Sequence, residues 1–177
     1  YPSLKPLAQW CTDLNLRCKQ MDEWAESGLP KVFWLSGFTY PTGFLTGLLQ
    51  TSARKNGLAI DGLNWEFPVL NQDEGSITSY PKEGAYVKGL FLEGARWDLD
   101  HGCLVEPNPM ELFCDMPLVH FKPVENKKRA GKGTYVCPVG FFCPDGSKYK
   151  SNNPLEGACN KYLNIKYDPD GKLPERW

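Results

Sequence analysis

Apolar positions in the first sixty residues recur at steps of three and four, the spacing of amphipathic helices. In the first such stretch Ser3 is a candidate N-cap, Pro6 is tolerated in a first turn, and Gly28 provides a stop. We therefore expect a helix that ends near Ser27. The predicted buried face carries Leu7, Trp10, Leu14, Cys18, Met21 and Trp24. Cys11 and Cys18 are expected to be small buried residues of this helix.

A second helix is predicted from Pro41 to the position before Gly57, which is a natural residue for a helix end. Its predicted apolar face carries Phe44, Leu45, Leu48, Leu49 and Ala53. Gly43 and Gly47 lie four positions apart within it. We expect these two glycines to let a neighbouring backbone pack closely against the helix.

Beyond residue 60 the period of the apolar positions changes to two, which is typical of strands with one buried face. Strands are predicted in residues 63–69, 85–94, 103–106, 117–124, 133–142 and within 153–168. Gly89 and Gly94 mark bends or bulges in the second of these segments. Closing a sheet removes its exposed edges, so we expect the strands to form a barrel or a sandwich. The sequence predicts an α+β fold, with a helical subdomain (1–60) followed by a small, roughly six-stranded antiparallel β-barrel subdomain (61–177).

Length and charge narrow the possible functions. A chain of 177 residues makes about one domain. The 20 basic and 21 acidic residues leave a net charge of −1, which lacks the field that sequence-independent binding to nucleic acid or anionic membranes requires. The sequence has no apolar run of about 18 residues, the length of a membrane span. We therefore expect neither a nucleic-acid nor a membrane partner.

No motif in the sequence points to catalysis, a cofactor or a metal. The segment RAGKGT (129–134) is not a phosphate-binding P-loop, because Asn126 stands where that motif requires glycine. The possible zinc ligands lack the CxxC spacing of a zinc knuckle; they are Cys114, His120, Cys137, Cys143 and Cys159. A Cys103–His120 nucleophile pair needs a third group to orient the imidazole. A regulatory disulfide between Cys137 and Cys143 stays open as an alternative.

Aromatic residues offer another possible function. The six tryptophans and eight tyrosines could line a groove that binds a peptide or a carbohydrate. However, Trp10, Trp24 and Trp65 lie on apolar stripes, which favours core packing. Trp97 differs from them, because the sequence ARWD places it between charged residues at the end of a predicted strand.

Several motifs together resemble the C-terminal domain of dynein heavy chains. They match in order and spacing over about residues 1 to 138, and GLFLEGARWD is the most specific of them. The motifs are YPSLKPLAQW (1–10), FWLSGF (33–38), PTGFLTGLLQTSARK (41–55), KGLFLEGARWD (88–98) and MPLVHFKPV (116–124). From Gly140 onward the sequence departs from the family pattern, with extra cysteines and the tail DPDGKLPERW.

The resemblance implies a helical subdomain leading into a small β-barrel, with no catalytic, cofactor-binding or metal-binding residues in this chain. It also implies that ATP and magnesium bind elsewhere in the parent heavy chain, which is a minus-end-directed microtubule motor of the cytoskeleton, in a cilium or flagellum axoneme. The implied partner is the ATPase ring of the same heavy chain, with other dynein subunits and microtubules reached through the parent. The domain would cap that ring and tune its motion and processivity.

The candidate ring-contact residues are Glu93, Arg96, Trp97 and Asp98, because a charged cluster around an aromatic side chain suits an interface. An equally good alternative is that Glu93 and Arg96 pair inside the domain while Trp97 plugs the barrel.

Overall fold

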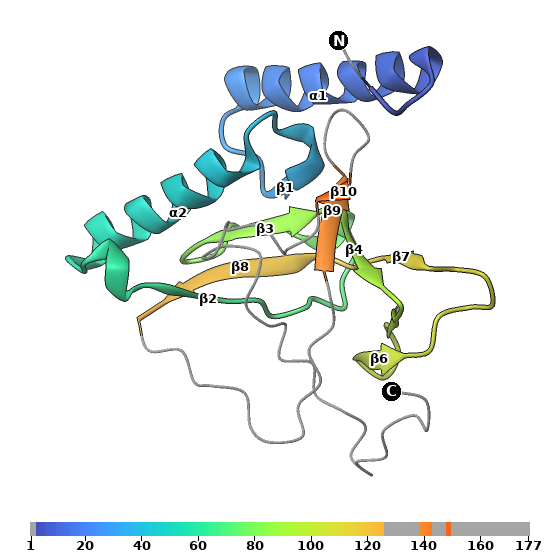
Figure 1. Ribbon diagram of the computed structural model, residues 1–177. Coiled ribbons are helices and arrows are strands. Elements are labelled where there is room, and N and C mark those ends of the chain that lie inside the picture. The colour runs from blue at the N-terminus through green and yellow to red at the C-terminus, as the bar shows by residue number, and fades with distance from the viewer. Residues whose placement is uncertain (1–2, 126–138, 143–147, 150–177) are drawn as a thin grey trace.

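The structure, a computed structural model, describes residues 3–125, 139–142 and 148–149 (Figure 1). The predicted strand within 153–168, the RAGKGT segment, and Cys137, Cys143 and Cys159 lie outside these residues.

Two α-helices form the N-terminal part of the molecule, as predicted. Helix α1 spans Leu7–Ser27 and helix α2 spans Pro41–Asn56. Gly57 ends α2 in the left-handed conformation, at a φ of 65°, and its N–H bonds the carbonyl of Ala53. The N-cap position of α1 is Pro6, so the prediction for Ser3 is wrong. The Ser3 hydroxyl instead accepts a hydrogen bond from the backbone N–H of Lys5, which turns the chain just before the helix.

The ten strands of the described residues form three sheets. The first sheet has the order β1 (Val32–Trp34), β3 (Ala85–Lys88), β8 (Val119–Val124) and β2 (Asn64–Glu66). The second has the order β10 (Lys148–Tyr149), β9 (Val139–Phe142), β4 (Leu90–Glu93) and β7 (Phe113–Asp115). The third is a ribbon of β5 (Arg96–Asp98) and β6 (Cys103–Val105). Short 3₁₀ turns lie at Leu35–Gly37, Ile60–Gly62 and Glu74–Ser76.

The α+β class is confirmed, but the sheet pairing differs in detail from the prediction. Strand β1 lies inside the predicted helical subdomain and pairs in parallel with β3, so the first sheet is mixed rather than purely antiparallel. Gly89, at a φ of 83°, divides residues 85–94 into β3 and β4, which belong to different sheets. Within the described residues the pairings do not close into a ring. Barrel closure and the boundary at residue 60 therefore stay predictions.

The hydrophobic core lies where the two four-stranded sheets meet α2. Trp65 of β2 is 2% exposed and contacts Phe121 of β8 edge-to-face, which confirms the core role predicted for this tryptophan. Leu45 is the most deeply buried residue of α2. The close backbone packing expected at Gly43 and Gly47 is not observed, because a Cβ at Gly47 would meet nothing within 4 Å and one at Gly43 would meet only the Tyr40 ring.

Helix α1 packs on the domain through a face that shares only Trp10 and Trp24 with the predicted one. None of its residues is buried, and Leu7 is 76% exposed. Cys11 and Cys18, predicted to be buried, are exposed. The face turned toward the domain is half-buried and largely polar; it comprises Trp10, Asp13, Arg17, Gln20 and Trp24. The pattern of apolar positions found the two tryptophans of this face but missed Asp13, Arg17 and Gln20, because these side chains are polar.

Gln20 makes the most informative of these contacts. Its Oε1 accepts the backbone N–H of Trp34 at 2.7 Å, and its Nε2 donates to the Trp34 carbonyl at 3.3 Å. The side-chain amide thus bonds the edge of β1 much as a neighbouring strand would. Beside it, the Trp24 ring packs edge-to-face on Phe33 of β1, with centroids 5.3 Å apart.

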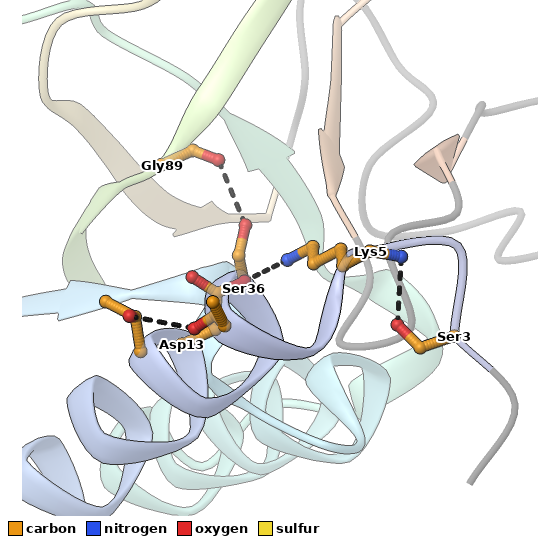
Figure 2. Close-up of polar contacts among 7 residues, drawn as sticks. Ser3, Lys5, Asp13, Ser36 and Gly89 are labelled. Atoms are coloured by element: carbon orange, nitrogen blue, oxygen red, sulfur yellow. Dashed lines mark hydrogen bonds and ion pairs between the residues drawn. The ribbon is translucent and has the colours of Figure 1, made fainter.

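A second set of polar contacts fixes the beginning of α1 (Figure 2). The ammonium group of Lys5 pairs with the carboxylate of Asp13, one to two turns into the helix. Next to them, the Ser36 hydroxyl donates to the carbonyl of Gly89 at 3.2 Å and joins the 3₁₀ turn after β1 to the bend between β3 and β4. Helix α1 lies across one end of the molecule (Figure 1), where Gln20 and Trp24 hold it against β1.

Candidate functional site

The four predicted contact residues lie on two consecutive strands joined by a tight bend. Glu93 is the last residue of β4 and pairs in register with Phe113, whereas Arg96, Trp97 and Asp98 make up β5. Gly94 forms the bend at a φ of 72°, and its N–H bonds the carbonyl of Leu112. The structure therefore brings the four residues to the base and first strand of the β5–β6 hairpin, at the opposite end of the view from α1 (Figure 1).

Trp97 anchors this hairpin to the rest of the domain. The side chain is half-buried, packs against the core and lies opposite Leu104 of β6. Its indole Nε1 donates a hydrogen bond to Oδ1 of Asn71 at 2.9 Å. Asn71 lies in the polar loop before β3 and was not predicted, because no local pattern links it to Trp97, 26 positions along the sequence.

Asp98 organises the turn of the hairpin. Its Oδ1 accepts the backbone N–H groups of Asp100 at 2.9 Å and His101 at 3.4 Å, and its Oδ2 lies 2.8 Å from Nδ1 of His101. The pKa of Asp98 lies below its ordinary value, chiefly because of the hydrogen bond with the His101 side chain. Desolvation is the next largest effect and raises the pKa, and the two backbone hydrogen bonds lower it further. Gly102 completes the turn at a φ of 63°. Asp98 is therefore a structural residue of the turn, and His101 is a second residue that was not predicted.

Exposure separates the four candidates. Arg96 is exposed, whereas Glu93, Trp97 and Asp98 are half-buried. An exposed guanidinium beside a half-buried aromatic ring is the combination that protein interfaces favour. Arg96 is thus the candidate best placed to contact a partner. The alternative, an internal pair of Glu93 with Arg96, stays a prediction.

The cysteine and histidine residues considered for chemistry lie apart in the fold. Cys103 belongs to the β5–β6 ribbon, whereas His120 belongs to β8, where its Nε2 lies 2.7 Å from the Glu83 carbonyl and its ring contacts Tyr86. Cys114 is 2% exposed, and burial raises the pKa of its thiol, with the Glu111 carboxylate adding to the effect. In the described part of the protein, no three histidine, cysteine or acidic side chains are grouped so as to hold a metal ion.

Comparison with known proteins assigns the family. Residues 1–140 match the C-terminal domain of the dynein heavy chain family. The protein belongs to this family. Its relatives include the dynein-1-beta heavy chain of the flagellar inner arm I1 complex from Chlamydomonas reinhardtii, 60% identical over 142 residues. Dynein axonemal heavy chain 2 of Homo sapiens is 52% identical over 143 residues.

These relatives are far longer than the 177 residues described by this sequence. Each alignment covers 80% of this sequence but 3% of the relative. The family match of the dynein C-terminal domain ends at residue 140, where the departure from the family pattern is expected. Among the helices described, none combines the length and apolar character that crossing a membrane needs.

Proposed function

We propose that this dynein C-terminal domain is a regulatory and structural cap that packs on the ATPase ring of its own heavy chain. The observation that carries the proposal is the family match over residues 1–140, supported by relatives that are 52 to 60% identical. Because those relatives are named as axonemal and flagellar dyneins, we assign the parent protein to the axoneme of a cilium or flagellum. It acts there as a minus-end-directed motor together with microtubules and other dynein subunits.

In this proposal the domain itself is not an enzyme. ATP and magnesium belong to other parts of the parent heavy chain, and residues 1–177 supply no catalytic group or cofactor ligand. The described side chains that could do chemistry have structural surroundings instead: Cys114 is buried, and His120 faces a backbone carbonyl. The fold we propose for residues 1–177 is the helical subdomain of residues 1–60 followed by a β subdomain that closes into a barrel through strands beyond β8.

The cap acts by favouring one arrangement of the ring over another. A domain that contacts two ring modules more favourably in one arrangement shifts the population by at most the difference in its binding free energy. Such couplings are typically about 1–3 kcal/mol, so the expected effect is modulatory rather than all-or-none. We propose the β5–β6 hairpin, with Glu93, Arg96, Trp97 and Asp98, as one of the contact surfaces.

The alternative of an aromatic-lined module for peptides or carbohydrates has less support. The rings of Trp24, Phe33, Phe38 and Phe44 pack against one another, and the ring centroids of Phe38 and Phe44 lie 4.5 Å apart. Trp65 is buried. These aromatic side chains are used in packing within the domain.

The proposal is tested by charge reversal at the hairpin of a full heavy chain. Arg96→Glu changes an exposed side chain and leaves the core contacts of Trp97 in place. We expect it to shorten the run length of the motor on microtubules about two- to tenfold, because it weakens one of the two ring contacts. Trp97→Ala is expected to act in the same direction, with an added loss of packing.

The matched control is Arg54→Glu, which reverses an exposed arginine at the far end of α2. It is expected to leave the run length within experimental error of the unmodified motor. An unchanged run length in Arg96→Glu, with the domain still folded, contradicts the hairpin as a contact surface. Lysine cross-linking then tests the cap itself, since a cap yields cross-links between this domain and ring segments of the same heavy chain.

A further inference from the structure

Helix α1 carries an apolar stripe that no described part of the domain covers. Its positions follow steps of four and three, the spacing of a helix-packing seam. We define the α1 stripe as Leu7, Cys11, Leu14, Cys18, Met21 and Ala25. Leu7 is 76% exposed, Leu14 and Met21 are each 38% exposed, and the two cysteines and Ala25 are also exposed.

The stripe and the packed face of α1 are different surfaces. At 100° per residue, the stripe lies about a quarter turn around the helix from the half-buried face. That packed face is fixed to the domain by Gln20 on the β1 edge and by Trp24 on Phe33. The stripe is therefore held in a constant orientation on a rigid helix, which lowers the entropy cost of docking.

From this placement we infer that the α1 stripe is a second docking surface, and that its occupant is an apolar helical ridge of the same heavy chain outside residues 1–177. The inference rests on the proposed function and deepens it by naming the face and the partner chemistry. The occupant belongs to the ATPase ring and is mainly uncharged.

The size of the stripe favours an occupant on the same polypeptide. A 21-residue helix is about 31 Å long, and a face about 10 Å wide offers about 300 Å². Stable association of separate chains usually buries about 800 Å² on each partner. A partner joined covalently works at an effective concentration in the millimolar range, so a much smaller contact is sufficient. The relatives are far longer than the aligned region, which is 3% of their length, so a partner on the same polypeptide is sterically available in a chain of that size.

The side chains of the stripe indicate the chemistry of the occupant. The small Cys11 and Cys18 alternate with the larger Leu7, Leu14 and Met21 and are seven residues apart. Large apolar side chains at the same spacing on a partner helix would pack over the two small residues, as ridges pack into grooves. Along the outer edge of the stripe lie Ala8, Asn15, Asp22 and Glu26, of which the two charged residues are both acidic. A coiled-coil pair of two such domains would instead be expected to carry complementary acidic and basic residues along that edge.

A photocross-linking experiment on the purified full-length heavy chain identifies the occupant. A benzophenone amino acid replaces Leu14 in the stripe or, as a matched control, Leu16, which is 49% exposed on the other side of the same helix. We expect Leu14 to capture a peptide from the ring of the same molecule, and Leu16 to capture none. Capture of residues 126–177, capture of a second heavy chain, or no capture at Leu14 each overturns the inference.

Thiol footprinting measures occupancy without a bulky probe. In the native heavy chain we expect iodoacetamide to alkylate Cys11 and Cys18 about tenfold more slowly than a cysteine introduced by Gln9→Cys, which lies opposite the stripe. Leu14→Glu is expected to raise the rates at both cysteines to within about threefold of that control, and Leu16→Glu to leave them slow. Fast alkylation of Cys11 and Cys18 in the unmodified protein overturns the inference.

The failure of this inference is distinguishable from the failure of the cap itself. If lysine cross-links join the domain to the ring while Cys11 and Cys18 react fast, the cap stands and the α1 stripe is not its contact. If the cross-links are absent as well, the proposed function fails too.

Discussion

Gly84 cannot be substituted without disturbing the first sheet. It has a φ of +76°, and a Cβ built on it would lie 1.8 Å from the carbonyl oxygen of Phe121. That carbonyl belongs to β8, which pairs with β3 directly after Gly84. Any side chain at this position therefore meets both backbone strain and a clash with backbone.

We predict that Gly84→Ala lowers the free energy of unfolding by about 3 kcal/mol or more, because the backbone of β3 or β8 must move. Denaturant unfolding followed by circular dichroism measures the change. The control is Gly47→Ala in α2, where a Cβ meets nothing within 4 Å. This control is expected to stabilise the helix by up to about 1 kcal/mol. A smaller loss at Gly84 than at other loop glycines would contradict the prediction.

The contact between Asp98 and His101 predicts a pH dependence at the hairpin. Because the folded state lowers the pKa of Asp98, the ionised carboxylate stabilises the fold above about pH 4, and this contribution is lost as the pH falls through the lowered pKa. His101→Ala removes the largest cause of the shift. We expect the pKa of Asp98 to rise toward its ordinary value, as measured by an NMR titration of its carboxyl carbon. An unchanged pKa would show that the backbone hydrogen bonds alone set it.

At the scale of elements, α1 protects the sheet as well as packing on it. Gln20 satisfies both the N–H and the carbonyl of Trp34 on the free edge of β1. An unpaired edge is a template for adding a strand from another polypeptide. The Gln20 side chain of α1 thus occupies the hydrogen-bonding groups that a strand from another polypeptide would need at this position.

We predict that Gln20→Ala lowers the free energy of unfolding by about 1–3 kcal/mol, because it leaves two backbone groups without their partner. The matched control is Gln9→Ala, the same substitution at an exposed position of the same helix, with an expected change within about 0.5 kcal/mol. Urea unfolding midpoints compare the two variants. Equal midpoints would mean that water replaces the amide without cost.

The sequence predicted the elements whose signals are local. The structure confirms the two helices and the strand segments at 63–69, 103–106 and 117–124. These elements could be predicted because their periodicity and their glycine and proline boundaries depend only on neighbouring residues in the sequence. Strand β5 was missed because it directly follows the bend at Gly94, where the predicted strand ends. Strand β7 was missed because it lies in the short segment between Pro109 and Pro117, where proline indicates turns. The parallel pairing of β1 with β3 has no local signal at all.

For the candidate site too, the sequence predicted the residues that carry a local signal and missed those that tertiary contacts bring in. The sequence singled out Trp97 and its charged neighbours, and the structure brings them together on one hairpin. It did not reveal Asn71 or the turn role of His101, since these depend on tertiary contacts. It also assigned the exposed stripe of α1 to the core, because apolar spacing shows that a face is available for packing but not what it packs against.

On the scale of the whole molecule, the β5–β6 hairpin and α1 lie at opposite ends (Figure 1). When a rigid domain binds through two contacts, the two contacts are thermodynamically coupled. Weakening one contact raises the fraction of domains that are detached at both. This coupling needs no conformational change inside the domain.

We predict that Arg96→Glu, at the hairpin, speeds the alkylation of Cys18 on the distant α1 stripe about fivefold or more in the full heavy chain. Mass spectrometry of the Cys18 peptide measures the rate, and Arg54→Glu is the control expected to have no effect. An unchanged rate at Cys18, with a shortened run length, would mean that the two surfaces act independently.

The register of the first sheet has a consequence for biosynthesis. Val32 pairs with Tyr86 and Asn64 pairs with Val124, so β1 and β2 each pair with a strand far along the sequence. During synthesis, both strands are therefore made well before the strands with which they pair. During that interval Gln20 has no finished sheet edge to protect, and the apolar side chains of the nascent helix are open to chaperones. The first sheet can therefore form in full only after the segment from Val32 to Val124 has left the ribosome, because its last strand in sequence, β8, pairs with both β2 and β3.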